Sequence, residues 1–353
     1  MSKIRVAVLG ATGMIGQRFV QMLEGHPYFE IEGLYASDRS DGKKLKDVLK
    51  VRDFEYKNET LDMKMETMDL KKIAKNARVA FSGLPSDLAG KTESDLAEGG
   101  IAVFSNAGAH RMDKDVSILI PEVNPSHLDS VKDQATYGNG GYIVTNANCS
   151  TTGIAPPLAA VRDAYGLDFV SVSTYQALSG AGYPGVPSLD AVGNVIPFIG
   201  GEEEKMEAEI VKILGTYEDR SFNYAKFRML ANCARVPVID GHLESLVIKM
   251  DDTPSVEELI RTLSSYKGEP QSLKLPSAPV QPIIVRTENN RPQPALDSMA
   301  GSPERARGMS VVAGRIRKSD EYYKLFVLSH NTMRGGAGGS LLNAELAKAK
   351  KLL

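Results

Sequence analysis

The stretch that decides the fold is IRVAVLGATGMIG, residues 4–16, close to the start of the chain. Residues 4–9 form a continuous apolar-rich run, which is typical of a strand buried on both faces. Three glycines then follow at intervals of three, before a helix-like segment that runs to about Glu24. Glycines at such a turn allow a pyrophosphate to approach the backbone, and the helix N-terminus stabilises its charge. This placement predicts nucleotide binding.

The pattern that surrounds this loop predicts an α/β protein. Further strands are expected at 31–36, 78–81 and 101–104, with helices at 13–24 and 86–98. This alternation indicates a doubly wound parallel sheet of the Rossmann type. Later strands are expected at 169–177, 243–250, 309–316 and 323–329, with helices at 202–214 and 255–264. Fewer helices per strand favour an α+β second domain with a mixed sheet that carries helices on one face.

We therefore expect three parts: a cofactor-binding domain at 1–147, a catalytic and dimerisation domain at 148–330, and a C-terminal segment at 331–353. The last segment is helix-like from Ser340 to Leu353 and is expected to return to the first domain. The proline-rich stretch 276–303 is expected to form a long loop or arm.

Composition excludes several classes of function. The 353 residues carry a net charge of −2, which predicts no special attraction to nucleic acid or to anionic membranes. No run approaches the roughly 20 apolar residues of a membrane span, and the chain enters its first strand without the apolar region of a signal peptide. Two cysteines far apart offer neither a disulfide framework nor metal-ligand spacing, which fits a reducing compartment. We expect a cytoplasmic protein without a metal.

Residues at the end of the second strand, about 20 positions beyond the glycine loop, should bind the ribose of the nucleotide. An acidic residue there would favour NAD, but Asp38 stands slightly past the usual place. Arg39, with the hydroxyls of Ser37 and Ser40, could instead hold a 2′-phosphate. The alternative is a solvated basic turn. The pattern favours NADP over NAD.

Cys149 is the candidate nucleophile. It stands in Asn146-Ala147-Asn148-Cys149-Ser150-Thr151-Thr152, between a strand-like run and a helix-like run. The unpaired N–H groups of a helix start favour the thiolate, which is the form that attacks carbonyl carbon. The other cysteine, Cys233, lies in a strand-like stretch with no helix start behind it, so we interpret it as structural.

A thiol nucleophile beside a nicotinamide cofactor suggests thioester chemistry with hydride transfer, which needs an acid or base. Among the histidines, His242 follows a glycine turn and opens a strand, so it can project into a cleft. On these grounds alone a catalytic and a structural role are about equally favoured.

Six motifs in this order resemble the archaeal and fungal branch of the aspartate-β-semialdehyde dehydrogenases. They are Gly10 to Gly16, Asn148-Cys149-Ser150-Thr151, Gln176 to Gly182, Glu202 to Glu209, Arg235 to Val238 with Gly241-His242, and His330-Asn331-Thr332. They span essentially the whole chain, and the intervals between them agree with the family. The set is more specific than any single motif.

The resemblance implies that Cys149 is acylated, that Gln176 positions the thioester and that His242 is the general acid/base. It also implies substrate-binding residues: Arg235 for the α-carboxylate, Glu209 for the ammonium, Arg111 and Lys212 for the phosphate, and Asn148. Without the resemblance, Glu209 and Lys212 would be interpreted as an ordinary surface ion pair. The expected cofactor contacts are Gly10, Thr12, Gly13, Met14, Ile15, Ser37, Arg39, Ser40, Ser82, Gly83, Ser179, Gly180 and Asn331.

The implied reaction is the NADPH-dependent reductive dephosphorylation of L-aspartyl-4-phosphate to aspartate semialdehyde, in the biosynthesis of lysine, threonine, methionine and isoleucine. The partners implied are the small-molecule substrate, inorganic phosphate and a second copy of the chain, as a homodimer or homotetramer. Malonyl-CoA reductase, with a similar Ser179 to Gly185 segment, is the nearest alternative, although Asn148 and Glu209 count against it. A non-catalytic NADP-binding sensor would need neither Cys149 nor His242.

Overall fold

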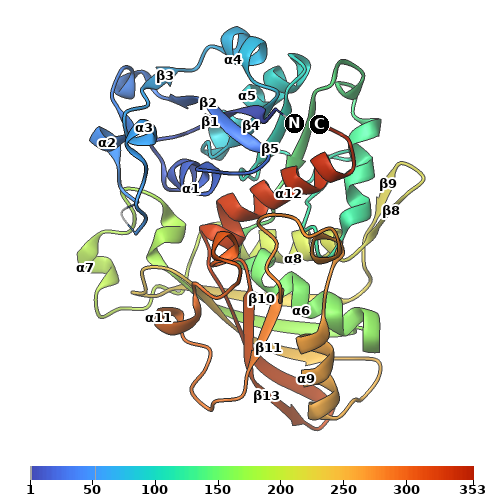
Figure 1. Cartoon of the computed structure of the whole chain (residues 1–353). Coiled ribbons are helices and arrows are strands. Elements are labelled where there is room, and N and C mark those ends of the chain that lie inside the picture. The colour runs from blue at the N-terminus through green and yellow to red at the C-terminus, as the bar shows by residue number, and fades with distance from the viewer. Residues whose placement is uncertain (1, 52) are drawn as a thin grey trace.

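The computed structural model describes residues 2–51 and 53–353, and its two large sheets lie one above the other in Figure 1. The upper sheet is parallel throughout, with strand order β3-β2-β1-β4-β5-β6. Its strands are β1 (Ile4–Leu9), β2 (Phe29–Ala36), β3 (Met65–Thr67), β4 (Val79–Ser82), β5 (Ala102–Ser105) and β6 (Tyr142–Thr145). This order is that of the doubly wound dinucleotide-binding fold, whose ligands bind beyond the carboxyl ends of the strands.

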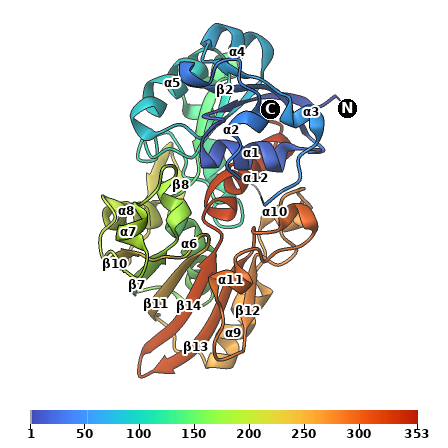
Figure 2. The same ribbon diagram turned by 90° about the vertical axis from the view of Figure 1, so that its left-hand side faces the viewer.

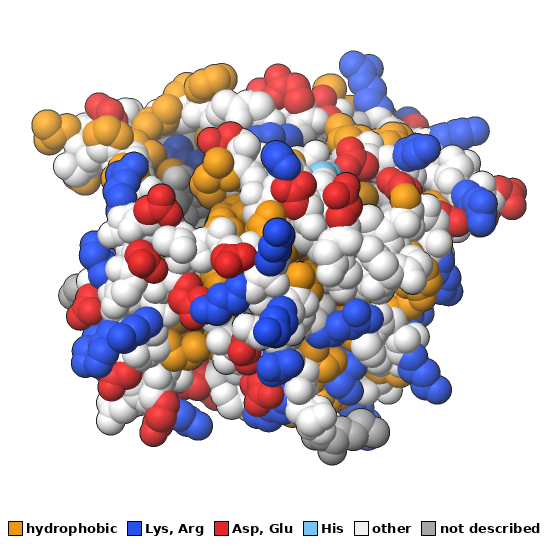
Figure 3. Space-filling view, turned by 90° about the horizontal axis from the view of Figure 1, so that it is seen from above, with side chains coloured by type: hydrophobic (Ala, Val, Ile, Leu, Met, Phe, Trp, Pro, Cys, Tyr) orange, Lys and Arg blue, Asp and Glu red, His pale blue; other side chains and the backbone are white. Residues whose placement is uncertain are grey.

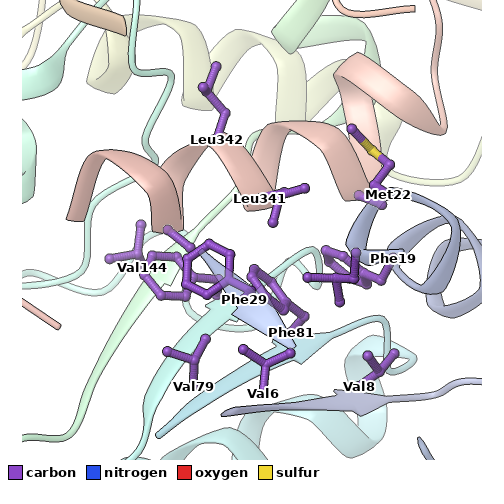
Figure 4. Close-up of a cluster of buried hydrophobic side chains, with 14 of the residues drawn as sticks. Val6, Val8, Phe19, Met22, Phe29, Val79, Phe81, Val144, Leu341 and Leu342 are labelled. Carbon is purple, nitrogen blue, oxygen red and sulfur yellow. The ribbon is translucent and has the colours of Figure 1, made fainter. Parts of the chain in front are cut away.

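Helices cover both faces of the upper sheet, which explains why its strands are apolar on both sides. One face packs against α1 (Met14–Leu23) and α12 (Gly338–Ala349), and the other packs against α4 (Leu70–Asn76) and α5 (Ser86–Glu98). Figure 4 shows Phe19, Phe29 and Phe81 meeting between α1, α12 and the sheet, with the Phe19 and Phe81 ring centroids 5.0 Å apart. Each fully buried side chain of this kind stabilises the fold by about 1.5–3 kcal/mol.

The lower sheet is mixed, with strand order β10-β7-β11-β14-β13-β12. Its strands are β7 (Phe169–Gln176), β10 (Arg228–Arg235), β11 (His242–Lys249), β12 (Ile283–Arg286), β13 (Val311–Ser319) and β14 (Tyr322–Ser329). Neighbours are parallel at both edges and antiparallel in the middle. A core of apolar side chains joins one face of this sheet to α6 (Cys149–Tyr165), α8 (Glu202–Ile213) and α9 (Val256–Ser265). The expected fold class is confirmed in both sheets.

The remaining elements are short. They are η1 (Asp38–Ser40), α2 (Leu45–Val48), α3 (Asn58–Leu61), η2 (Pro125–Asp133), η3 (Tyr137–Asn139), η4 (Leu178–Ala181), α7 (Ser188–Ala191), α10 (Glu269–Ser272), α11 (Pro294–Asp297), η5 (Glu304–Ala306), the π turn η6 (Met333–Ala337) and the hairpin strands β8 (Thr216–Glu218) and β9 (Ser221–Asn223). The stretch 276–303 is therefore more ordered than the arm expected from its prolines. Its residues Ile283–Arg286 form β12, because apolar side chains there pair with β13 at the sheet edge.

The C-terminal segment links the two sheets. In Figures 1 and 2, η6 and α12 run from the end of β14 back onto the upper sheet, beside α1. Arg334 in η6 donates two hydrogen bonds to the carboxylate of Glu122, at 2.7 and 2.9 Å, and both side chains are buried. Glu345 in α12 meets His26 at 2.9 Å with both side chains fully buried. These polar contacts hold the segment against the first domain.

The face seen in Figure 3 carries Lys, Arg, Asp and Glu side chains interspersed with one another. This distribution agrees with the small net charge of −2. Among the described residues, none of the helices combines the length and the apolar character needed to cross a membrane.

Candidate active site

The glycine loop between β1 and α1 has the backbone shape that the sequence predicts. Gly10 has φ +71°, and a Cβ on Gly16 would lie only 2.2 Å from the Gly10 carbonyl oxygen, so neither position accepts a side chain. Within the described residues, no side chain caps the start of α1, so its first N–H groups are free to face an anion. Thr12 to Ile15 are partly exposed at this edge.

Cys149 is the first residue of α6, directly after the short connection from β6. The side-chain oxygen of Asn148 accepts hydrogen bonds from the N–H groups of Ser150 and Thr151, at 2.9 and 3.2 Å. Burial raises the pKa of the Cys149 thiol to about 12, Glu202 adds to the rise, and Arg235 and Arg111 oppose it. Burial thus moves the pKa of the thiol in the opposite direction to the one expected from the helix start, where Asn148 accepts two of the first N–H groups.

His242, at the start of β11, places Nε2 3.2 Å from the Cys149 sulfur. Its Nδ1 accepts the backbone N–H of Ala177 at 3.0 Å, so the neutral ring carries its proton on Nε2 and directs it at the sulfur. Burial lowers the His242 pKa to about 3, and the positive charge of Arg235 lowers it further. The two residues therefore form a thiol with a neutral imidazole N–H donor, rather than a thiolate–imidazolium pair.

A cavity of about 400 Å³ opens above Cys149 and joins the two halves of the molecule. Met14 and Ile15 of the glycine loop lie at one side, and Gln176, Arg235 and Glu202 from the second domain lie at another. Other lining residues are Asn106, Arg111, Ala147, Asn148, Ser179, Gly180, Ala181, Gly182, Ile199, Gly200, Lys205, Asn331, Thr332 and Gly335. A group bound at the glycine loop would thus share one cavity with the thiol.

Glu202 organises the polar floor of this cavity. Its Oε1 accepts hydrogen bonds from the side-chain amides of Asn148 and Gln176, at 2.9 and 3.0 Å. Arg235 anchors one guanidinium nitrogen on the Ala177 carbonyl at 2.8 Å. A carboxylate and a guanidinium therefore line the same cavity, and together they suit a ligand with an ammonium and a carboxylate.

The backbone at Gly180 packs closely against Arg235 and His242. A Cβ on Gly180 would lie 2.9 Å from Nη1 of Arg235 and 3.2 Å from Nε2 of His242. The Asn331 amide donates to the Ser179 hydroxyl at 2.8 Å and accepts the Gly241 N–H at 2.9 Å. On the other side of the thiol, a Cβ on Gly335 would lie 2.8 Å from the Cys149 Cβ. Glycines therefore let the backbone close around the thiol and the imidazole.

Comparison with known proteins identifies the family. Residues 5–131 match the family described as semialdehyde dehydrogenase, NAD binding domain, and residues 158–334 match its dimerisation domain. The aspartate-semialdehyde dehydrogenases of Archaeoglobus fulgidus and Methanothermobacter thermautotrophicus are 48% and 45% identical, over 99% and 97% of this chain and 99% and 98% of theirs. The chain belongs to the aspartate-semialdehyde dehydrogenase family.

Solved structures agree with this assignment. The aspartate semialdehyde dehydrogenase of Candida albicans, solved with NADP, is 39% identical, has a TM-score of 0.88 and covers 100% of both chains. The aspartate semialdehyde dehydrogenase II of Vibrio cholerae, at 24% identity and a TM-score of 0.75 over 99% of both chains, shares the fold. The resemblance based on motifs is confirmed, and the chain is an enzyme of this family.

Two of the residues implied by the family resemblance lie outside the cavity. The Glu209 carboxylate is buried, accepting hydrogen bonds from Arg111 at 2.8 Å and from the Asn148 N–H at 2.7 Å. Lys212 Nζ donates to the carbonyls of Arg111, Asp113 and Val116 at 2.7–2.9 Å, and its side chain is buried. With all three donors engaged, Lys212 cannot also hold a phosphate. Glu209 and Lys212 instead fix the loop that carries Arg111, which corrects their predicted roles.

Sequence reasoning missed Glu202 and Lys205, which line the cavity from the first turn of α8. Their spacing of three residues repeats that of Glu209 and Lys212, so the signal was present but ambiguous. The prediction that Ser82 contacts the cofactor is also corrected, because its side chain is fully buried at the end of β4. Gly83 follows at the sheet edge and is partly exposed.

The structure also shows where the second cysteine and the residues predicted to contact the ribose lie. Ser37 and Arg39 are exposed at the carboxyl end of β2, and Ser40 is partly exposed beside them. Cys233 is buried on β10, with its sulfur 3.6 Å from that of Met206. The ribose contacts of Ser37, Arg39 and Ser40 stay predictions.

Proposed function

We propose that this enzyme reduces L-aspartyl-4-phosphate to L-aspartate-4-semialdehyde, releasing phosphate, by way of a thioester on Cys149. The observation that carries the proposal is the 3.2 Å approach of the Cys149 sulfur to His242 Nε2, beside a cavity that the glycine loop, Arg235 and Glu202 also line. A reaction of this kind would supply a precursor of lysine, threonine, methionine and isoleucine.

The cofactor we propose is NADP. The uncapped start of α1 and the tight glycine turn suit a pyrophosphate, and the exposed Arg39 suits a 2′-phosphate. The other proposed contacts are Gly10, Thr12, Gly13, Met14, Ile15, Ser37, Ser40, Gly83, Ser179, Gly180 and Asn331. When bound, NADPH supplies the hydride that reduces the thioester carbon.

We assign the two ends of the substrate to opposite charges in the cavity. Arg235 receives the α-carboxylate, because a guanidinium can bind a carboxylate through two parallel hydrogen bonds. Glu202 receives the ammonium in place of Glu209, since it is the glutamate that lines the cavity. Arg111 and Lys205 are the cations placed to hold the phosphate, with Lys205 in place of Lys212.

In the acylation step the Cys149 sulfur forms a bond to the acyl carbon while the bond from that carbon to the phosphate oxygen breaks. The thiol proton goes to the departing phosphate, because the nearest ring nitrogen, Nε2 of His242, already carries a proton. Gln176 and Asn148, both bound to Glu202, hold the acyl group in position. Most of the catalysis then comes from positioning and fixed charges.

His242 is proposed as the hydrogen-bond donor to the oxygen that becomes negative at the reacting carbon. The Ala177 N–H occupies Nδ1, so the ring remains neutral with its proton on Nε2. A neutral imidazole can stabilise a developing oxyanion in this way. The role proposed for His242 is therefore that of a hydrogen-bond donor, whereas the family resemblance implied a general acid/base.

Several broader assignments are part of the same proposal. The matched dimerisation domain supports a homodimer or homotetramer, and the second sheet offers a face that the helices α6, α8 and α9 do not cover. We assign residues 1–147 to cofactor binding, 148–330 to catalysis and dimerisation, and 331–353 to the returning segment. The two unpaired cysteines fit a cytoplasmic location.

The test is to incubate the enzyme with aspartate semialdehyde, phosphate and NADP, and to follow formation of NADPH by absorbance. Phosphate-dependent reduction supports the proposal. A parallel assay uses malonate semialdehyde with CoA. Turnover only in that second assay would contradict the proposal and favour a malonyl-CoA reductase.

A further inference from the structure

A group of buried polar side chains lies under the first turn of α6 and takes no part in the steps above. It consists of Glu244 on β11, Ser150 on α6 and Ser329 at the end of β14, each at most 1% exposed. Among the described residues, neither carboxyl oxygen of Glu244 and neither of the two hydroxyl oxygens has a hydrogen-bond partner. Buried polar atoms without partners are rare and costly, so this group calls for an explanation.

The three side chains are held against one another by the backbone. Glu244 follows His242 by two residues on the same face of β11, and Ser329 stands directly opposite His242 in the pairing of β11 with β14. A Cβ placed on Gly153 in α6 would lie 2.6 Å from the Ser329 oxygen and 3.1 Å from Oε2 of Glu244. The group therefore fills the contact between the helix that carries Cys149 and the strand that carries His242.

The surroundings of Glu244 disfavour a negative charge. Within the described part of the chain, no lysine, arginine or histidine forms an ion pair with it. The titratable groups nearest to it are Cys149 from α6, Glu202 from α8, Cys233 from β10 and His242 from β11 itself, while β7 presents Thr174 and β14 presents Ser329. Burial raises the pKa of Glu244 well above its ordinary value, with Glu202 adding to the rise and the nearby Ser150 hydroxyl opposing it.

We propose that Glu244 is a neutral carboxylic acid that positions Cys149 by joining the hydroxyls of Ser150 and Ser329. A carboxylic acid offers one O–H donor and a carbonyl acceptor, and each serine hydroxyl can rotate to donate or accept. The network ties the first turn of α6 to β11 and β14, and so fixes the sulfur over His242. An ionised Glu244 would instead place an uncompensated anion under the thiol and oppose thiolate formation.

The inference that Glu244 positions Cys149 rests on the proposed function. Two of the measurements that test it do not require turnover. The first is the infrared difference spectrum between the wild-type enzyme and Glu244→Gln at neutral pH. A protonated carboxyl C=O band should be present in the wild type and lost in the variant. The exposed Glu257 provides the matched control, since Glu257→Gln should remove only a carboxylate band. Loss of a carboxylate band in Glu244→Gln would overturn the proposal.

The second readout is the pH dependence of Cys149 alkylation by iodoacetamide. Glu244→Gln replaces one neutral group by another, so the apparent pKa of Cys149 should stay unchanged. If Glu244 were ionised, removing its charge would lower that pKa, and a downward shift would overturn the proposal. Ser150→Ala gives an independent check without changing Glu244, because the acid C=O band should shift when a hydrogen-bond partner is lost. An unshifted band in both Ser150→Ala and Ser329→Ala would contradict the network.

Kinetics complete the test. Glu244→Gln should retain activity within about threefold, since the amide keeps one donor and one acceptor. Glu244→Ala should lower kcat about tenfold or more with little change in KM, because a displaced sulfur slows the chemical step. Equal activity of the alanine variant and the wild type would show that Glu244 does not position Cys149.

Discussion

The two Glu–Lys pairs of α8 have the same spacing and lie in opposite environments. Glu202 and Lys205 line the cavity above Cys149, whereas Glu209 and Lys212 are buried against the loop that carries Arg111. Seven residues separate the pairs, which is about two turns, so both project from nearly the same side of the helix. The distance along the helix axis therefore decides which pair meets the substrate and which supports the fold.

The strongest test of this contrast is the stability of Lys212→Met. The substitution removes the donor that now satisfies the buried carbonyls of Arg111 and Val116 and the partly buried carbonyl of Asp113. Unsatisfied buried groups cost about 1–3 kcal/mol each, so the free energy of unfolding should fall by roughly 3 kcal/mol or more. Urea denaturation measures this loss.

Lys205→Met is the matched control, because Lys205 is exposed at the cavity near the start of the same helix. Its free energy of unfolding should change by less than about 0.5 kcal/mol, while the KM for phosphate should rise about tenfold. A stable Lys212→Met enzyme with a raised KM for phosphate would reverse the two roles.

The glutamates sharpen the same contrast through substrate choice. Glu202→Gln should lower kcat/KM for aspartate semialdehyde by about a hundredfold, because a substrate ammonium in the cavity loses its countercharge. The same aldehyde without the α-amino group should lose much less. Glu209→Gln should instead weaken the fold and affect both aldehydes alike. An equal penalty for both aldehydes in Glu202→Gln would remove this residue from ammonium recognition.

Arg39 offers a third kind of cation, exposed at the end of β2. Arg39→Ala should weaken NADP binding by about 1.5–3 kcal/mol, the value of a charge-assisted hydrogen bond. NAD binding should change little, since NAD lacks the 2′-phosphate. Titration calorimetry with both cofactors measures the difference, and equal losses would show that Arg39 does not contact that phosphate.

A separate prediction concerns pH. Burial lowers the pKa of His26 and lowers those of His127 and His330 to about 4 and of His242 to about 3. In the unfolded chain these groups bind protons below a pKa of about 6.5, so the unfolded state gains protons first as pH falls. Stability should therefore decrease from about pH 6.5 downward, by up to about 1.4 kcal/mol per pH unit for each group. Flat stability between pH 7 and 5 would contradict this.

Much of the fold and part of the site could be predicted from the sequence. Residues 4–16 predicted the strand, the turn and the helix because a positive φ at Gly10 and the tight approach at Gly16 demand glycine. The joint role of Cys149 and His242 was implied by the family resemblance, and the two residues meet although they lie 93 positions apart. The roles of Glu202 and Glu209 could not be separated, since helical spacing places both on one side of α8.

The direction of the Cys149 pKa shift was also not predicted from the sequence. A helix start favours the thiolate, but here burial raises the pKa of the thiol, and Asn148 accepts two of the first N–H groups. Ser82 was predicted to contact the cofactor, but it is buried. A residue at the end of a strand can direct its side chain into the core, and the sequence does not show which direction it takes. Strand β12 was not predicted, because the prolines around its four residues indicated a loop.

The central claim is that Cys149 is acylated during the reaction, and mass spectrometry tests it most directly. The enzyme is incubated with aspartate semialdehyde and NADP without phosphate, quenched with acid and digested. An aspartyl adduct should be found on the peptide that contains Cys149, be released by phosphate before quenching, and be absent from Cys149→Ser. Cys233→Ser should form the adduct normally. An adduct on Cys233, or full turnover by Cys149→Ser, would contradict the account.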